Sequence, residues 1–371
     1  MQTYHVRLES PVSRSFRCQR AADSLDIDAS KKSVHELRVQ ADLETPFSVG
    51  LIVGSSGSGK TTLAHKMFGP TCFDVEPDPE RPIIEQLPEA LSYDECAELL
   101  SGIGLTSVPC WIRPVKTLSN GQRARATAAL AMSRPDRKIA VLDEWTSVVD
   151  RTVAKVMSHC VQKFFRRNQR SVVLVSCHYD VIEWLNPDWI IDCNRQEWID
   201  RRLLRPEQRA RTEQLSFDVR EVDRSSWRYF SKYHYLSELL PGGQIFTFGL
   251  FHGVDQIGFQ CFANYVPTRK GMTPIFHSNR TVIHPDYAGM GLGIRLINET
   301  SRVMKARGYR VMAKFSSIPI YRSMIKNPEW KLADVKRQIG KMNVGGNMLR
   351  RSGFRENIRT FSFEFTGARK T

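Results

Sequence analysis

The chain has 371 residues, of which 41% are hydrophobic and 25% are charged, as in an ordinary globular protein of about two domains. No apolar run approaches the roughly 20 residues that span a bilayer, and the first residues lack the apolar core of a signal peptide. We therefore expect a cytoplasmic protein with no membrane partner. The eight cysteines include no Cys-x-x-Cys pair, so neither a zinc site nor a disulfide framework is indicated.

The net charge of +15 is concentrated in the C-terminal part of the chain. Residues 201–371 contain 30 Lys and Arg and 13 Asp and Glu, whereas the whole chain contains 54 and 39. The excess of positive charge therefore falls entirely within 201–371. This asymmetry favours a polyanionic partner, nucleic acid first, although a merely soluble basic surface is the alternative.

The N-terminal part begins with alternating stretches, such as residues 4–8 and 35–39, that predict antiparallel strands. They lead into an apolar run, residues 47–53, with the length and composition of a buried strand. A glycine-rich loop, residues 54–61, follows and reads GSSGSGKT. Strand, loop and helix start form the context in which backbone N–H groups and a helix dipole bind phosphate.

Four further stretches of the N-terminal part carry polar residues at the ends of predicted elements. Residues 83–86 predict a short strand that ends in Gln86, and residues 89–105 have helical spacing. Ser119 in Leu-Ser-Asn-Gly-Gln (118–122) caps an Ala-rich helix. Two apolar strands end at Asp143-Glu144 and at His178, where carboxylates suit a Mg²⁺ shell and a histidine can contact a phosphate.

Taken in this order and spacing, the motifs of residues 1–204 resemble the ATP-binding-cassette ATPases. The resemblance implies a Mg²⁺-dependent ATP site with Glu144 as catalytic base, His178 as switch histidine and Thr61, Gln86 and Asp143 around the metal. The ATP-binding residues that it implies are Gly54, Gly57, Gly59, Lys60, Thr61, Thr62, Gln86, Ser119, Gly121, Gln122 and Asp143.

In this family the signature stretch completes the ATP site of a second subunit. Residues 118–122 match that signature, with Asn120 where Gly is usual. Since the chain has one such head, the resemblance implies an ATP-dependent homodimer.

The C-terminal part begins after an Arg- and Glu-rich linker, predicted at residues 205–225. An aromatic and basic stretch, 227–236, precedes a hairpin over 244–265 and a strand over 280–283. A glycine-rich loop and an amphipathic helix over 294–307 follow, and then a strand over 310–315 and a helix from Ile318. No acidic ribose-binding residue ends that last strand, so a dinucleotide is disfavoured.

Residues 226–371 resemble the GCN5-related N-acetyltransferases (GNAT). Together the two resemblances imply an α/β chain in which a P-loop ATPase domain is followed by an α+β GNAT-like domain. The resemblance implies that Gly289, Gly291 and Gly293 hold the pyrophosphate of acetyl-CoA or a related acyl-CoA. Ala288 replaces the usual Arg or Gln at the first position of the family's loop motif. Tyr321 falls where many of these enzymes keep a tyrosine acid, and simple packing is the alternative.

The Tyr233-His234-Tyr235 cluster is similar to phage Mom-type enzymes, which share the acetyltransferase fold and modify adenine in DNA. On that likeness His234 and Tyr235 are the candidate active-site residues, with a metal as one option. Aromatic residues among basic ones also suit an extruded base, whereas a satisfied buried histidine and core aromatics are the alternative.

Three hypotheses follow from the sequence. The first is an ATP-hydrolysing enzyme that transfers an acetyl or related small group to nucleic acid, with DNA favoured over RNA. The second is an acetyltransferase of a protein or small amine that its ATPase regulates. The third is an ATP-dependent nucleic-acid clamp with a degenerate transferase fold.

Overall fold

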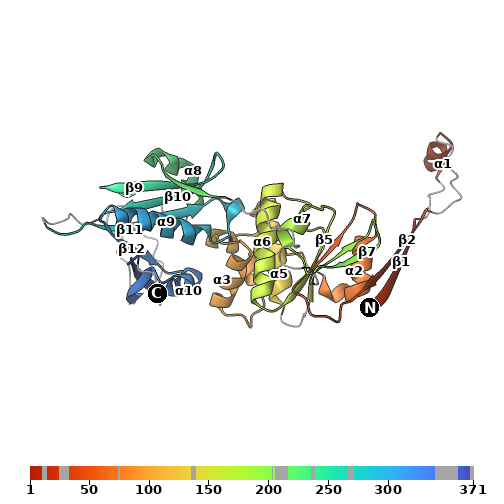
Figure 1. Cartoon of the computed structure of the whole chain (residues 1–371). Coiled ribbons are helices and arrows are strands. Elements are labelled where there is room, and N and C mark those ends of the chain that lie inside the picture. The colour runs from red at the N-terminus through yellow and green to blue at the C-terminus, as the bar shows by residue number, and fades with distance from the viewer. Residues whose placement is uncertain are drawn as a thin grey trace. The chain divides into compact units, whose positions relative to one another are not determined.

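The structure, a computed structural model, describes residues 1–10, 15–24, 33–73, 76–134, 139–202, 204, 216–234, 239–265, 271–338 and 358–367. It is a mixed α/β chain that divides into two compact units (Figure 1). The first unit comprises residues 1–90 and 110–214, and the second comprises residues 91–109 and 215–371. Each unit has its own sheet and its own core.

The first unit is built on a five-stranded sheet in the order β4-β5-β3-β6-β7. Its four strands β4, β5, β3 and β6 are parallel, and β7 pairs antiparallel with β6. Since the polar motifs follow β3, β4 and β5, the parallel order brings them to one edge of the sheet. The strands are β3 (Val49–Val53), β4 (Ile139–Leu142), β5 (Ser171–Ser176), β6 (Trp189–Asp192) and β7 (Glu197–Asp200).

Helices cover this sheet because its strands are apolar on both faces. Ile52, Val173 and Val175 pack in one core with Leu63 of the helix that follows the glycine-rich loop. The intervening residues, such as Leu51, are also fully buried, as expected of parallel strands with two covered faces. The helices are α2 (Lys60–Phe68), α5 (Asn120–Ser133), α6 (Arg151–Arg167) and α7 (Val181–Leu185). The short α4 (Val108–Trp111) spans the position in the sequence at which segment 91–109 of the second unit ends and segment 110–214 of the first begins.

The predicted N-terminal strands are confirmed. β1 (Gln2–Ser10) and β2 (Ser33–Ala41) pair antiparallel with Val6 opposite Leu37, and α1 (Phe16–Asp23) lies between them in the sequence. Their buried side chains join the core of the five-stranded sheet.

Within the first unit, residues 83–86 were wrongly predicted as a strand. Ile83–Glu85 form a 3₁₀ turn, and the Gln86 N–H closes it on the Ile83 carbonyl at 3.1 Å. Pro82 holds φ at −59° directly before the turn and adopts the extended conformation typical of a residue that precedes a helical turn. Ile83 is therefore buried in a turn rather than in a sheet, and Ile84 is half-buried.

The second unit contains a seven-stranded sheet in the order β13-β14-β12-β11-β10-β9-β8. β11 and β12 are parallel and are joined through α9, while every other neighbouring pair is antiparallel. The strands are β8 (Asp218–Glu221), β9 (Ile245–His252), β10 (Asp255–Ala263), β11 (Ile275–Ile283), β12 (Arg310–Phe315), β13 (Trp330–Gln338) and β14 (Ile358–Phe365).

The helices of the second unit are α3 (Tyr93–Gly102), α8 (Trp227–Phe230), α9 (Leu292–Ala306) and α10 (Ile318–Ile325). α3 packs against α10, and Arg322 forms an ion pair with Glu98 there. β8 lies in the stretch 205–225 that the sequence assigns to a linker. Among the described residues, no helix has the length and apolar character needed to cross a bilayer.

Candidate functional site

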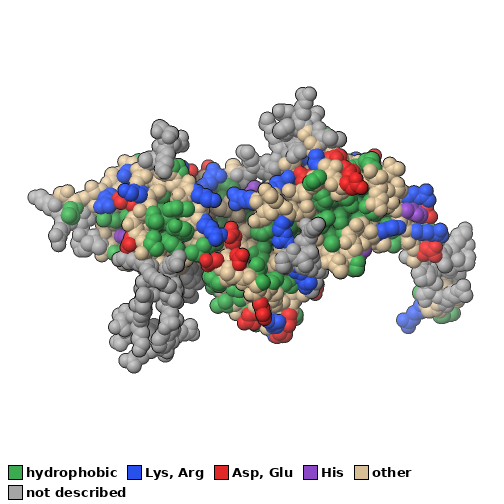
Figure 2. Space-filling view, turned by 90° about the horizontal axis from the view of Figure 1, so that it is seen from below, with side chains coloured by type: hydrophobic (Ala, Val, Ile, Leu, Met, Phe, Trp, Pro, Cys, Tyr) green, Lys and Arg blue, Asp and Glu red, His purple; other side chains and the backbone are tan. Residues whose placement is uncertain are grey.

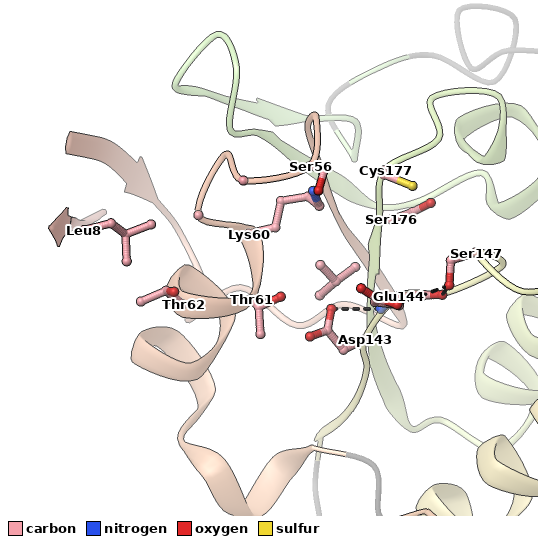
Figure 3. A pocket seen from close by; sticks show the side chains of 13 residues that line it. Leu8, Ser56, Lys60, Thr61, Thr62, Asp143, Glu144, Ser147, Ser176 and Cys177 are labelled. Atoms are coloured by element: carbon pink, nitrogen blue, oxygen red, sulfur yellow. Dashed lines mark hydrogen bonds between the residues drawn. The ribbon is translucent and has the colours of Figure 1, made fainter. Parts of the chain in front are cut away.

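A cavity of about 270 Å³ lies at the edge of the first sheet where the glycine-rich loop meets the ends of β4 and β5 (Figure 3). The loop and α2 form one side of it, and the turn after β4 forms another. Its lining residues are Leu8, Ser56, Gly57, Gly59, Lys60, Thr61, Thr62, Asp143, Glu144, Ser147, Val175, Ser176 and Cys177. The structure thus brings together seven of the residues that the sequence assigned to ATP or catalysis.

The glycine-rich loop has a backbone that only glycine adopts readily. Gly57 and Gly59 have φ values of 79° and 86°, in the left-handed region. Gly59 is the N-cap of α2, so the first N–H groups of that helix face the cavity without a side-chain cap. Such free N–H groups and the helix dipole favour an anion.

Lys60 is the group of this loop that a ligand can engage, because it lines the cavity. Lys60 Nζ donates to the Ser55 carbonyl at 2.7 Å, a bond that an incoming phosphate would replace. The Ser58 hydroxyl is buried and has no hydrogen-bond partner among the described residues. Gly54 is also closely surrounded, because a Cβ there would lie 2.5 Å from Ser58 Oγ. A side chain at position 54 would therefore clash with the loop itself.

The turn after β4 carries the two carboxylates. Asp143 accepts the Glu144 N–H at 2.8 Å. Ser147 Oγ lies 2.8 Å from the Glu144 carbonyl and 3.4 Å from its carboxylate, as the dashed lines of Figure 3 indicate. Glu144 and Thr146 have φ values of 47° and 73°, a strained conformation for residues with a side chain. The turn is thus held in a specific geometry around Glu144.

The donor set of the cavity fits a magnesium ion. The Thr61 hydroxyl and the Asp143 carboxylate line the same cavity, and Mg²⁺ prefers such hard oxygen ligands together with phosphate oxygens. No group of three His, Cys, Asp or Glu side chains gathers as a metal site within the described part of the chain.

Gln86, the third predicted metal ligand, does not line the cavity. Its side-chain oxygen accepts the Asp78 N–H at 2.7 Å, and its amide donates to the Asp78 and Arg81 carbonyls at 3.0 Å each. All its polar atoms are therefore used within its own loop, and its role at the metal stays a prediction.

The signature residues also lie outside the cavity lining. Ser119 accepts the Gln122 N–H at 3.3 Å, and Gln122 accepts the Ser119 N–H at 3.1 Å, which makes a complete capping box on α5. Gly121 sits close to α6, since a Cβ there would lie 3.0 Å from Val153. His178 does not line the cavity either, although the preceding Ser176 and Cys177 do.

The sequence did not indicate one set of residues beside the loop. Asn194 accepts both the N–H and the hydroxyl of Ser55, and it binds Tyr179, which binds Asp192. The only available sequence signal was an amide shortly after an apolar strand, which is common in turns.

In the second unit, the loop before α9 has an open, bare backbone. Gly289 and Gly291 have φ values of 90° and 79°, and a Cβ at Gly291 would meet nothing within 4 Å. A Cβ at Gly293 would meet Ile283 at 3.8 Å. These features fit a pyrophosphate above the helix start. Ala288 is only 8% exposed, so its methyl group faces the protein rather than a ligand.

His234 belongs to the aromatic stretch of the second unit. Its ring lies edge-on to that of Trp227, with the ring centres 5.7 Å apart. Burial, and then the positive charge of Arg280, lower its pKa to about 4, so the imidazole is neutral at physiological pH. A neutral imidazole can accept a proton or bind a metal. Tyr235 lies outside the described residues.

Tyr233 makes a contact that the sequence did not indicate. Its hydroxyl lies 3.1 Å from His284 Nε2, at the end of β11, and His284 Nδ1 lies 3.5 Å from the Asp286 carboxylate. The Lys232 ammonium lies 4.9 Å from the centre of the Tyr233 ring. Tyr233, His284 and Asp286 thus form a line of polar contacts. His284 and Asp286 lie shortly before the loop glycines in the sequence.

Tyr321 is half-buried and packs against the core of the second unit. Its ring stacks on Phe361, with the ring centres 4.1 Å apart, and lies in the same hydrophobic cluster as α9 and β12. This geometry agrees with the packing alternative for Tyr321, and its role as an acid stays a prediction.

No protein-family model matches the sequence, and neither does any curated protein. Among solved structures, the chain aligns with the ATP-binding cassette MJ0796 in a dimeric post-hydrolysis state bound to ADP and Pi. That alignment has 17% identity, covers 45% of this chain and 92% of that chain, and has a TM-score of 0.36.

The chain also aligns with the ribosomal-protein-S18-alanine N-acetyltransferase from Escherichia coli. The identity is 11%, the alignment covers 42% of this chain and 97% of that chain, and the TM-score is 0.29. A GNAT family acetyltransferase from Elizabethkingia anophelis with acetyl-CoA bound gives 7% identity, 40% and 97% coverage, and a TM-score of 0.27. All three TM-scores lie below 0.5, so these alignments assign neither a function nor site residues to this chain.

Proposed function

We propose that the chain is an ATP-hydrolysing enzyme of the ATP-binding-cassette type. Its second unit is a GNAT-like acyltransferase that modifies nucleic acid, with DNA favoured over RNA. The observation that carries the first half is the cavity that joins Lys60, Thr61, Asp143 and Glu144. A cation, a hydroxyl and two carboxylates at a bare helix start are the parts that phosphoryl transfer needs.

Each of these residues has a distinct task in the proposed reaction. Lys60 exchanges the Ser55 carbonyl for phosphate oxygens and balances their charge. Thr61 and Asp143 would hold Mg²⁺, which supplies further neutralisation at the phosphates. Glu144, which the Ser147 hydroxyl approaches at 3.4 Å, orients the attacking water and takes its proton.

A second copy of the chain completes the proposed ATP site. Ser119, Gly121 and Gln122 lie outside the lining of the cavity, although they also sit at a helix start that suits phosphate. We therefore assign them to the ATP of a partner subunit. Glu144→Gln should keep ATP bound and the dimer closed, because only the base is lost, and light scattering with ATP measures this. A monomeric Glu144→Gln protein that binds ATP would contradict the dimer.

The transfer half rests on the parallel pair β11 and β12 and on the loop between β11 and α9. Gly289 and Gly291 offer backbone N–H groups for a pyrophosphate. The β10–β11 register shifts between Cys261 and Phe262 and leaves Asn279 unmatched in the middle of β11. Such a bulge frees backbone groups beside the place where an acyl chain would run.

Nucleic acid is favoured as acceptor by charge and by exposed aromatic rings. Tyr229 is 57% exposed, and the Arg228 guanidinium lies 4.7 Å above its ring. Stacked Tyr–Arg pairs suit an unpaired base and its phosphate. On the face drawn in Figure 2, Lys and Arg side chains are interspersed with apolar and acidic ones and do not form one block.

The test is mass spectrometry of nucleosides from cells that express the chain or its His234→Ala variant. A new modified nucleoside in the first strain and its loss in the second would support the proposal. No new nucleoside, together with acetylation of a protein or small amine by the purified chain, would overturn the choice of acceptor. Binding of DNA without binding of acetyl-CoA would support the clamp, which the apolar Ala288 favours.

A further inference from the structure

A line of hydrogen bonds runs from the glycine-rich loop to the segment that follows β5. The N–H and the hydroxyl of Ser55 donate to Asn194 Oδ1 at 3.2 and 2.9 Å. Asn194 Nδ2 donates to the Tyr179 hydroxyl at 3.2 Å, and that hydroxyl donates to Asp192 Oδ1 at 3.0 Å. None of these four residues is needed for the chemistry described above.

The direction of each bond is fixed by the chemistry of the groups. Burial and the bond to Asp192 raise the pKa of Tyr179, so the phenol keeps its proton at neutral pH. The single O–H hydrogen goes to the carboxylate, which leaves the phenol oxygen to accept the amide of Asn194. The amide oxygen must then face Ser55, and both Ser55 donors can reach it.

Asp192 anchors this line in the core of the sheet. It is only 4% exposed and also accepts the Asn194 N–H at 2.9 Å. The line therefore runs from Ser55 in the glycine-rich loop to this buried carboxylate, with Asn194 and Tyr179 between them.

Ser55 is the point at which a bound phosphate would act on this line. Its carbonyl accepts Lys60 Nζ at 2.7 Å, while its N–H and hydroxyl bind Asn194. A phosphate that bound Lys60 would free the Ser55 carbonyl, and the same residue holds Asn194 through its N–H and hydroxyl. Ser55 therefore joins a group that a phosphate would displace to a side chain outside the cavity lining.

Tyr179 is the point at which the change would arrive. It directly follows His178 and lies two residues after Cys177, which lines the cavity. The next residue, Asp180, binds Arg151 Nε at 2.9 Å, and the Arg151 guanidinium lies 4.8 Å above the ring of Trp184. Arg151 begins α6 directly after its cap, Asp150, so the segment is tied to the start of that helix.

We propose that Asn194 and Tyr179 are positioning residues that couple occupancy of the glycine-rich loop to the segment of His178 and the start of α6. This inference rests on the proposed ATP site. It would connect His178, the predicted switch histidine, to the glycine-rich loop without direct contact between His178 and the nucleotide.

The variant that tests this coupling is Tyr179→Phe, which removes one oxygen and keeps the ring. Tyr4→Phe is the matched control, since the Tyr4 hydroxyl binds Gln2 on its own strand. We expect kcat for ATP hydrolysis to fall about threefold to tenfold in Tyr179→Phe, because both hydrogen bonds of the hydroxyl are lost, while KM changes less than about twofold. Tyr4→Phe should change neither.

Hydrogen exchange in α7, residues 181–185, separates coupling from a merely structural effect. In the wild type, a non-hydrolysable ATP analogue should slow exchange there. In Tyr179→Phe this nucleotide-dependent difference should disappear, although the analogue still binds. A difference of the same size in both proteins would overturn the coupling. Failure of the wild type to bind the analogue would instead overturn the ATP site itself.

Discussion

The two glycine-rich loops of this chain share a backbone and differ in their surroundings. Gly59 caps α2 with φ 86° and ψ 11°, and Gly291 caps α9 with φ 79° and ψ 11°. Both follow a strand and leave the helix N–H groups without a side-chain cap. The backbone of each loop therefore favours an anion at the helix start.

The side chains decide what each site can do. The first loop contains Lys60 and faces the carboxylates Asp143 and Glu144 across a cavity. The second loop is preceded by Ala288, whose methyl group is buried, and by Tyr287, whose hydroxyl lies 3.1 Å from His252 Nδ1. The first arrangement contains the polar groups that the proposed hydrolysis uses, whereas the second loop adds no charged side chain at position 288 to its backbone N–H groups.

Removal of the first loop's cation should give the largest effect. In Lys60→Ala we expect ATP hydrolysis to fall by about two to three orders of magnitude, since a charged donor to the phosphates is lost. ATP-driven dimerisation should be lost as well, while the second unit stays folded. ATPase assays, light scattering and circular dichroism measure the three outcomes. Normal dimerisation of this variant with ATP would contradict the cassette-type site.

A pair of glycine variants tests whether the second loop depends on its backbone. Gly291→Ala should lower the free energy of unfolding of the second unit by about 1–2 kcal/mol, because alanine is strained at φ 79°. Gly293→Ala is the control, since it lies inside α9 and a methyl group has room there. Hydrogen exchange in α9 gives both values. Equal losses in the two variants would show that the left-handed cap is unimportant.

Cysteine labelling distinguishes the ligands of the two loops. Cys177 is exposed and lines the first cavity, so bound ATP or ADP should slow its alkylation severalfold. Acetyl-CoA should leave the rate unchanged, since its expected site is the loop of the second unit. Mass spectrometry of the labelled peptide measures this. Protection by acetyl-CoA would show that the two loops do not discriminate between these ligands.

The pH dependence of stability gives the smallest effect. The pKa of His234 is about 4 in the folded chain and about 6.5 when unfolded, so the unfolded chain binds the extra proton between these values. This residue therefore costs no stability above pH 6.5, and its cost grows as the pH falls toward 4.

His234→Gln should remove that cost, so the variant's Tm should fall by about 2 °C less than that of the wild type between pH 7.5 and pH 5. His252→Gln controls for the exchange itself. An identical pH profile in wild type and His234→Gln would mean that the pKa of His234 is the same in the folded and the unfolded chain.

Local patterns predicted much of this molecule. The elements around the loops and the cap at Ser119 were predicted because strand, glycine and helix follow each other within about ten residues. The meeting of Lys60, Asp143 and Glu144 could be predicted as well, since parallel strands present their ends at one edge.

Contacts between distant residues could not be predicted in this way. Asn194 and Ser55 are 139 positions apart, and an isolated asparagine carries no signal for such a partner. Gln86 follows an apolar pair that suited a strand, but the turn at Pro82 directs its amide back to Asp78. The attachment of α3 to the second unit likewise depends on packing that no local pattern encodes.

The strained turn after β4 implies a trade-off between stability and activity. Thr146 is β-branched, has φ 73°, and its buried hydroxyl lacks a partner among the described residues. Thr146→Gly would relieve about 1 kcal/mol of strain, so selection for stability alone would favour it. It would also loosen the turn that presents Glu144. A variant engineered for heat resistance should therefore retain Thr146 if it is also to retain its activity.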